Sequence, residues 1–355
     1  MNQLKESVLQ LIRTEILDDD KKAFIIKDKY NCNYVTGYTG DLTAVILTQF
    51  KNYIIVNSLY TEQVKQETTD YIPIIQKNNP NETIAEIMHS GNIDTIIGEF
   101  DSPEEVCKNF NVKKAICKKD FITDKRIIKY QYELDCIRKA NMISCDAFNH
   151  CLQFIKPGVT ELDIAAEIEY YMKKHGSYHT AFDTIVVSGI RSAMPHGTPS
   201  EKKLQTGDPV TLDFGAVYRS YCADITRTVF VGKPNDEMKK IYNLVLEAQT
   251  KTVDFVKAGL TGIEVDAYAR EIITSNGYGD YFVHGLGHGV GLQVHEAPSL
   301  SKRGTVPITE NSVVTVEPGI YVGNVGGVRI EDSVIVNKTG VEILTKNADK
   351  KLLVL

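Results

Sequence analysis

The second half of the chain repeats itself, and this repeat constrains the fold more than any other feature of the sequence. Residues 156–176, KPGVTELDIAAEIEYYMKKHG, align with residues 257–277, KAGLTGIEVDAYAREIITSNG, at one constant offset. Each copy is predicted to be a turn, then a threonine that can cap a helix, then an amphipathic helix. Such a duplication predicts that this region is built from two related halves.

A second sign of duplication lies downstream, where VTLDFG (210–215) and VTVEPG (314–319) each place one acid just before a turn-forming pair. The sequence predicts two hairpins with an acid on each arm: Asp213 and Asp224 in the first, Glu317 and Glu331 in the second. Directly opposed residues of a hairpin share a face. The second hairpin has its midpoint at Asn324 in GNVGG, a strong turn signal. The midpoint of the first falls between Tyr218 and Arg219, and a longer loop is expected there.

Packed about a pseudo-twofold axis, these hairpins would bring the four acids together among Val, Leu, Ile and Phe. Like charges in such a place cannot all stay ionised unless a cation is present. Solvent exposure of the acids is the alternative, but four mirrored positions in apolar runs favour convergence. A pair of divalent metal ions about 3.5 to 4 Å apart, bridged by carboxylates, would supply the charge and hold a water for metal-assisted hydrolysis.

The stretch VHGLGHGVGLQVHE (283–296) places His284 and His288 at the spacing of a helical zinc motif. Its four glycines exclude a helix, because each costs roughly 1 kcal/mol relative to alanine. The segment is expected to be a loop or irregular strand that delivers one imidazole to the ions. A surface loop with incidental histidines is the alternative. Oxygen donors with a single nitrogen favour manganese or cobalt over zinc.

Upstream of the duplication, between residues 23 and 118, short apolar runs alternate with polar helical ones. Strands interleaved with helices predict an α/β domain with a mixed sheet. A polar stretch then leads into a long helix, ELDCIRKANMISCDAFNHCLQFI. We place the domain boundary before that helix, which gives an N-terminal domain of residues 1–124 and a second domain of residues 125–355.

Composition argues against several classes of protein. No apolar run reaches the roughly 18 residues of a membrane span. A net charge of -6 without a basic block argues against a nucleic-acid partner. The seven cysteines are scattered and form no CxxC pair, which is typical of a reduced, cytoplasmic chain.

With these residues assembled, the chain resembles the pita-bread metallopeptidases, which include methionine aminopeptidase, aminopeptidase P, prolidase and the metal-free creatinase. VHGLGHGVGLQVHE together with GGVRIED is similar to the proline-specific branch, Xaa-Pro dipeptidase and aminopeptidase P. The resemblance implies an α/β (α+β) architecture, with a creatinase-like, RNase H-like N-terminal domain of mixed sheet. A duplicated pita-bread domain would follow it.

The resemblance also implies a metal-binding role for five residues. The family's ligands occur in the order Asp, Asp, His, Glu, Glu, and this sequence matches them at Asp213, Asp224, His288, Glu317 and Glu331. Asp213 and Asp224 would hold the first ion. His288 and Glu317 would hold the second, and Glu331 would bridge both.

Other positions match family residues that act on the substrate. His196, in SAMPHG, and His295 match histidines that contact the scissile carbonyl and the developing oxyanion, and Glu317 would relay a proton to the leaving nitrogen. His284 matches a histidine of the proline pocket. Arg329 matches an arginine that orients active-site groups by hydrogen bonding.

The activity implied by this resemblance is that of a dinuclear metallo-exopeptidase, with manganese expected and cobalt the alternative. A hydroxide bridging the metals would attack the bond between an N-terminal residue and proline in small peptides. By analogy the enzyme would be a homodimer. An Xaa-Pro dipeptidase, an Xaa-Pro aminopeptidase acting on longer peptides and a broader aminopeptidase stay open. A non-catalytic binding module is a remote alternative. Members of the fold with that role lack metal-ligating residues, whereas all five are present in this sequence. We expect Tyr321 and Phe182 to pack in the core rather than line a pocket.

Overall fold

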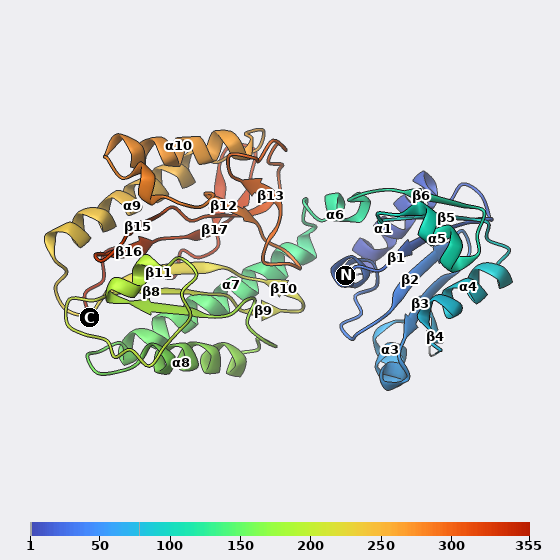
Figure 1. Cartoon of the computed structure of the whole chain (residues 1–355), viewed down its shortest axis with the longest axis horizontal. Coiled ribbons are helices and arrows are strands. Elements are labelled where there is room, and N and C mark those ends of the chain that lie inside the picture. The colour runs from blue at the N-terminus through green and yellow to red at the C-terminus, as the bar shows by residue number, and fades with distance from the viewer. Residues whose placement is uncertain (1, 78) are drawn as a thin grey trace. The chain divides into compact units, whose positions relative to one another are not determined.

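The structure is a computed structural model that describes residues 2–77 and 79–355. The chain divides into two compact units, Met1–Arg126 and Ile127–Leu355 (Figure 1). None of the helices in these described ranges has the length and apolar character that a bilayer crossing requires.

The first unit is built on a mixed sheet, as the alternating pattern predicted. Its six strands lie in the order β4-β3-β2-β1-β5-β6. The β1–β2 and β2–β3 pairs are antiparallel, and the other three pairs are parallel. The strands are β1 (Lys22–Ile26), β2 (Ala44–Thr48), β3 (Asn52–Val56), β4 (Ile72–Ile75), β5 (Thr95–Gly98) and β6 (Lys114–Cys117). The helices are α1 (Asn2–Glu15), α2 (Lys29–Thr36), α3 (Thr61–Glu67), α4 (Pro80–Ser90), α5 (Pro103–Phe110) and α6 (Phe121–Lys125), with a 3-10 turn at Ser58–Tyr60.

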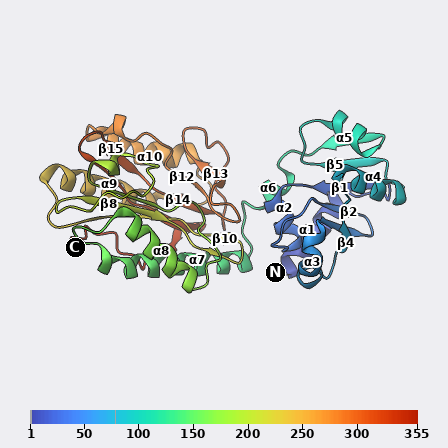
Figure 2. The same ribbon diagram turned by 60° about the horizontal axis from the view of Figure 1, so that its bottom comes forward.

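In the second unit, two pairs of helices enclose the strands. In both views α7 and α8 lie on one side of the sheets and α9 and α10 on the other (Figures 1 and 2). The helices are α7 (Gln131–Cys151), α8 (Glu161–Lys174), α9 (Asp236–Phe255) and α10 (Gly262–Ser275), with 3-10 turns at Leu152–Phe154, Gly189–Ala193 and Gly279–Tyr281. Each pair of helices therefore covers the strands of its own half.

The strands of this unit form two principal sheets, ordered β11-β8-β7 and β13-β12-β14-β17-β18, and two short ribbons, β9-β10 and β15-β16. In the first half they are β7 (Ile185–Ser188), β8 (Pro209–Phe214), β9 (Val217–Tyr218), β10 (Tyr221–Cys222) and β11 (Ile225–Phe230). In the second half they are β12 (Gly287–Gly289), β13 (Glu296–Leu300), β14 (Val313–Val316), β15 (Gly319–Val322), β16 (Gly326–Arg329), β17 (Asp332–Val336) and β18 (Val341–Ile343).

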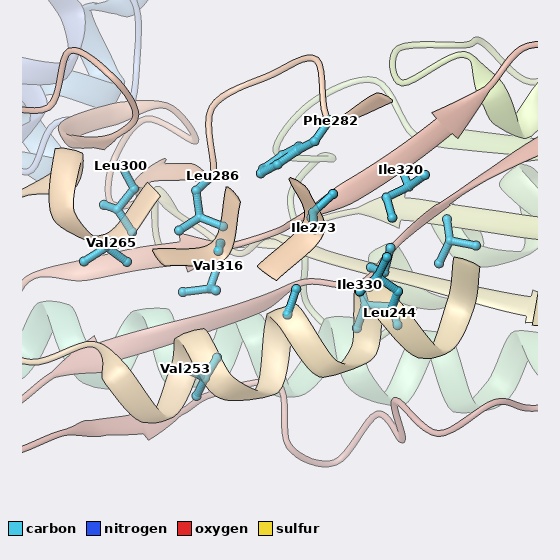
Figure 3. Close-up of a cluster of buried hydrophobic side chains, with 14 of the residues drawn as sticks. Leu244, Val253, Val265, Ile273, Phe282, Leu286, Leu300, Val316, Ile320 and Ile330 are labelled. Atoms are coloured by element: carbon cyan, nitrogen blue, oxygen red, sulfur yellow. The ribbon is translucent and has the colours of Figure 1, made fainter. Parts of the chain in front are cut away.

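Each half buries its own apolar cluster between helices and strands. Ile164 of α8 packs with Leu212 and Phe214 of β8 in the first half. Figure 3 shows the second cluster, in which Leu244 of α9 and Ile273 of α10 pack with residues of the facing strands. Burial of one face of each helix pair is the main apolar contribution to the stability of this unit.

Local geometry confirms the duplication. The threonines Thr160 and Thr261 cap α8 and α10, and each accepts a hydrogen bond from the backbone N–H three residues on. The glycines two residues before these caps, Gly158 and Gly259, have φ of 90° and 96°. Only glycine adopts such angles without strain. The matched glycines that follow the two helices, Gly176 and Gly277, also have positive φ, at 105° and 84°.

The predicted register is right for one hairpin and wrong for the other. Pairing of Gly319 with Arg329 places the midpoint at Asn324, as predicted. In the first hairpin, Asp213 lies opposite Thr226 rather than Asp224. The expected longer loop is also wrong, because a two-residue turn, Arg219–Ser220, joins β9 and β10 with φ of 48° and 71°. Left-handed residues suit a tight hairpin turn. A register change of two residues leaves both acids on the same face.

One buried acid makes the stability of the second unit depend on pH. Glu133, in the first turn of α7, is only 2% exposed. Its carboxylate accepts hydrogen bonds from the backbone N–H of Tyr130 at 2.9 Å and the hydroxyl of Tyr221 at 3.0 Å. Burial nevertheless dominates and raises the pKa of Glu133 to about 7.

Replacement of this acid, Glu133→Gln, should remove its contribution to that pH dependence. Because the folded-state pKa is raised, the stabilising contribution is complete below the ordinary pKa of 4.5 and is lost as pH rises through 7. Relative to E133Q, the wild type should lose about 3 kcal/mol of unfolding free energy between pH 4.5 and pH 8. Urea denaturation across this range measures the difference. A constant difference between the two proteins would contradict the prediction.

Candidate metal centre

Four carboxylates meet where the two halves of the second unit join. Asp213 is near the end of β8 and Asp224 immediately precedes β11, whereas Glu317 follows β14 and Glu331 precedes β17. Oxygens of Asp213, Asp224 and Glu331 all lie within 4.8 Å of one another. The convergence that the mirrored hairpins predicted is therefore present in the folded chain.

Strands β11 and β17, one from each half, are tied together beside these acids. The N–H of Glu331 donates to the carbonyl of Thr226 at 3.1 Å, and the Thr226 hydroxyl donates to Glu331 Oε2 at 2.8 Å. In the reciprocal direction, the hydroxyl of Ser333 donates to the carbonyl of Asp224 at 2.7 Å. These contacts set the separation between an acid of the first half and an acid of the second.

His288 approaches the acids from β12. Its Nε2 lies 3.2 Å from Glu317 Oε1 and 3.6 Å from Asp224 Oδ2. Its backbone N–H donates to the Thr315 hydroxyl, which in turn donates to Glu317 Oε1, each at 3.0 Å. The glycine-rich segment thus brings one imidazole to the carboxylates, as expected.

The glycines on either side of His288 make this approach possible. A Cβ at Gly287 would lie 2.2 Å from the carbonyl oxygen of Thr315, and one at Gly289 would lie 2.2 Å from that of Ala297. Both distances are far below van der Waals contact. Since β12 pairs with β13 on one edge and β14 on the other, these positions admit only glycine without a shift of the backbone.

The cluster carries more negative charge than its surroundings can stabilise. Burial, followed by repulsion from neighbouring acids, raises the pKa of Asp224 and of Glu331 well above their ordinary values. Burial opposes ionisation of Glu317 as well. The hydrogen bond and charge of His288 outweigh that effect and lower the Glu317 pKa to about 2. Burial likewise raises the pKa of Asp213, although Arg329 partly counters it.

These features fit a cation-binding site. Asp213 Oδ1 and Glu331 Oε1 are buried and have no hydrogen-bond partner in the described part of the chain. Buried carboxylate oxygens are rarely left without a donor or a cation. Divalent ions held by these acids and by His288 would satisfy the orphaned oxygens and offset the repulsion.

A chain of hydrogen bonds leads from Asp213 to His284. Arg329 donates to Asp213 Oδ2 and, through its other terminal nitrogen, to the Tyr321 hydroxyl at 2.8 Å. The same hydroxyl lies 2.8 Å from His284 Nε2. Tyr321 is thus a link between two predicted site residues, although we expected only core packing. Gly327, which pairs with Tyr321 across the hairpin, leaves room for its ring.

Arg227 is a second residue that the sequence reading missed. Its guanidinium is 2% exposed and donates to the carbonyls of Thr226 and Glu331 and to Asp332 Oδ1. It therefore braces both strands from the side opposite the metal-binding acids. An arginine in the apolar run that follows Asp224 was an available signal, because a charge there must be paired when it is buried.

Asp213, Asp224 and Glu317 line a cavity of about 720 Å³, with His196, His284 and His295 also in its wall. The ring centroids of His288 and His295 are 4.1 Å apart. Phe182 lines this cavity rather than the core, contrary to expectation. Glu331 does not contribute to the lining. The cavity thus brings together all five residues predicted to act on a substrate, namely His196, His284, His295, Glu317 and Arg329.

A buried ion pair holds the segment that carries His295. Lys129 Nζ lies 2.8 Å from Glu296 Oε1, and both side chains are almost fully buried. Glu296 also accepts a hydrogen bond from the backbone N–H of Gln293 at 3.3 Å. Burial lowers the pKa of His295, with a further contribution from His288.

Comparison with known proteins agrees with this geometry. Residues 135–338 match the model of metallopeptidase family M24, and residues 9–106 match that of the creatinase/prolidase N-terminal domain. An Xaa-Pro dipeptidase from Pyrococcus horikoshii is 40% identical over 98% of this chain and 97% of its own.

Two solved structures share the whole architecture. An Xaa-Pro dipeptidase from Bacillus anthracis is 38% identical, with a TM-score of 0.91, over 99% of this chain and 100% of its own. An X-Pro aminopeptidase from Thermotoga maritima is 40% identical, with a TM-score of 0.92, over 99% of each chain. The expected α/β fold, a creatinase-type domain followed by a pita-bread domain, is confirmed. The chain is a member of metallopeptidase family M24.

Proposed function

We propose that this chain hydrolyses the peptide bond between an N-terminal residue and proline. The observation that carries the proposal is the convergence of Asp213, Asp224, His288, Glu317 and Glu331 beside a cavity that three further histidines line. The names of its relatives, Xaa-Pro dipeptidase and X-Pro aminopeptidase, support the same substrate class. We place all of these residues in a catalytic domain of residues 125–355, which follows an N-terminal domain of residues 1–124.

We propose that two divalent ions bind at this site. Asp213 and Asp224 would hold one, His288 and Glu317 the other, and Glu331 both. Because oxygen donors dominate, manganese is the expected ion and cobalt the alternative. When bound, such ions polarise the scissile carbonyl and lower the pKa of a coordinated water.

The proton transfers would fall to Glu317. Its carboxylate would accept the proton of the attacking water as a general base. The same carboxylate would then deliver that proton to the proline nitrogen as the bond to the carbonyl carbon breaks. Glu317 lies in the cavity lining, where a substrate can reach it.

The histidines would bind the substrate and stabilise developing charge. Because burial lowers its pKa, His295 is neutral near pH 7 and can donate one N–H to the carbonyl oxygen. His196, at the exposed rim of the cavity, would donate a second hydrogen bond. His284, held by Tyr321, would line the pocket for the proline ring. Arg329 would orient Asp213 and Tyr321.

Two substrate lengths fit the proposal, because relatives carry both names. A dipeptidase would accept only Xaa-Pro, whereas an aminopeptidase would also release the first residue of longer peptides. We favour small peptides with proline in the second position as the substrates. We further propose that the enzyme is cytoplasmic and forms a homodimer. A net charge of -6 without a basic block supports a function without a nucleic-acid partner.

A panel of peptides with and without Mn²⁺ tests the activity. With Mn²⁺ we expect cleavage of Ala-Pro, and at least about tenfold lower kcat/KM for Ala-Ala, because a pocket shaped for the proline ring is left partly empty. Chromatography of the products measures both. Ala-Pro-Gly separates an aminopeptidase, which cleaves it, from a dipeptidase, which does not. Equal cleavage of Ala-Ala and Ala-Pro would contradict proline specificity.

Replacement of one acid, Asp224→Asn, should affect the metal-free and metal-loaded proteins differently. Without metal at pH 8, D224N should melt at or above the wild-type temperature, because it removes one of several buried like charges. At about 100 times the Kd, Mn²⁺ should raise the wild-type Tm by roughly 5 to 11 °C. Mn²⁺ should raise the Tm of D224N by distinctly less, because the ion that Asp224 would hold is lost. Differential scanning calorimetry measures both effects.

The matched control for this experiment is Asp254→Asn, because Asp254 is an exposed acid of the same unit. Its Mn²⁺ response should equal that of the wild type. A D224N protein that melts well below the wild type without metal, yet responds fully to Mn²⁺, would exclude Asp224 as a ligand.

A further inference from the structure

Each of the two duplicated helices buries a carboxylate that is not among the proposed metal ligands. Glu161, the first residue of α8, is 0% exposed, and Asp266 of α10 is 1% exposed. A carboxylate is buried at high cost unless several donors satisfy it. The identity of those donors therefore indicates what each acid does in the folded chain.

Glu161 binds both ends of the segment 188–200. Its Oε1 accepts from the backbone N–H and the hydroxyl of Ser188, at 2.7 and 2.8 Å. Its Oε2 accepts from the backbone N–H and the hydroxyl of Ser200, at 3.1 and 2.7 Å. Arg191 Nε adds a fifth donor at 3.1 Å. One side chain thus closes the segment into a loop.

This loop carries His196 into the cavity wall, together with the prolines on either side, Pro195 and Pro199. Arg191, held by Glu161, also donates to the carbonyl of Thr198 at 2.7 Å and so braces the loop internally. His196 itself is exposed. Glu161 therefore anchors both ends of the loop that positions the His196 backbone.

Asp266 serves the second loop through an arginine one turn along α10. Arg270 pairs with Asp266 through two hydrogen bonds, of 3.0 and 2.8 Å. The guanidinium also donates to the carbonyls of Phe282 and His284, each at 2.8 Å, and Asp266 Oδ1 accepts from the N–H of Leu286 at 3.0 Å. The pair is therefore hydrogen-bonded to the backbone before His284, at His284 and after it.

The two halves reach this arrangement with different residues. The position in α10 that corresponds to Glu161 is Gly262, where a Cβ would lie 1.9 Å from the carbonyl oxygen of Ser299. A glutamate is therefore excluded there by the approach of β13. The clamp of the second half lies instead at Asp266 and Arg270, a turn or more further along the helix. The duplication supplied the helix, and each half acquired its own anchor for a cavity histidine.

We propose that Glu161 and the Asp266–Arg270 pair are positioning residues for the hydrolysis, which act by fixing His196 and His284. The proposal rests on the proposed function, in which these histidines contact the substrate. A displacement of about 1 Å in a group that must meet the transition state is enough to lower the rate by roughly a hundredfold. Neither clamp touches the substrate in this scheme.

A double-mutant cycle tests the first clamp. Glu161→Gln keeps the size of the side chain but weakens its five hydrogen bonds, so kcat should fall about tenfold with KM within about twofold. In the His196→Ala background, E161Q should lower kcat by less than about twofold, because the group that it positions is gone. An equal fall in both backgrounds would overturn the proposal. The milder Ser200→Ala serves if E161Q does not fold.

The matched control is Glu167→Gln, on the same helix, which removes a carboxylate that bonds His150 at 2.6 Å outside the cavity. It should leave kcat unchanged. Amide hydrogen exchange on the metal-free protein supplies a readout independent of activity. E161Q should speed exchange within residues 189–199, and E167Q should not. Unchanged exchange in E161Q would also overturn the proposal.

The second clamp is tested in the same way with Arg270→Lys and the His284→Ala background. R270K keeps the charge but cannot donate to Asp266, Phe282 and His284 in the same fork, so exchange should rise within residues 282–287. Exposed Glu271→Gln is its control. If H196A or H284A keeps full activity, the proposed role of that histidine fails. The exchange data then still decide whether the clamp holds its loop.

Discussion

Mutual repulsion among buried carboxylates is the constraint that shapes the second unit. Asp213, Asp224 and Glu331 lie within one ion's reach of each other, in a setting where burial already disfavours their charge. The surrounding chain offsets only part of this through Arg329 and His288. Bound cations would neutralise the remaining negative charge. The strands, glycines and buried arginines around the acids hold these mutually repelling carboxylates close together.

Much of this could be predicted from the sequence, because periodicity and duplication leave a direct record there. The alternating apolar runs predicted the mixed sheet, and the matched threonine caps of α8 and α10 predicted the duplicated helices. Mirrored acids in apolar strands predicted a shared charged centre. Four glycines around His288 predicted an irregular segment in place of a helix, and the segment folds into the short strand β12, which pairs with β13 through a register shift.

Other features depend on contacts between residues far apart in the chain, and no local pattern records them. The register of the first hairpin was misread because Arg219 and Ser220 both adopt left-handed angles, which neither residue type favours. Tyr321 resembled a core residue until its hydroxyl was placed between Arg329 and His284. Nothing in the local sequence separates Glu161 from any other acid of a first helical turn, although it binds two serines that lie 27 and 39 residues away.

The cross-links between β11 and β17 have a consequence for how affinity arises. Thr226 and Ser333 each donate a hydrogen bond to a residue of the opposite half. The acids proposed to bind the ions also come from both halves, so neither half alone contains the whole site. Occupancy by a cation is therefore linked thermodynamically to the docking of the halves. Because acids of both halves would hold the ions, any parting of the halves would weaken ion binding, and retention of the ions would report on how well the halves fit together.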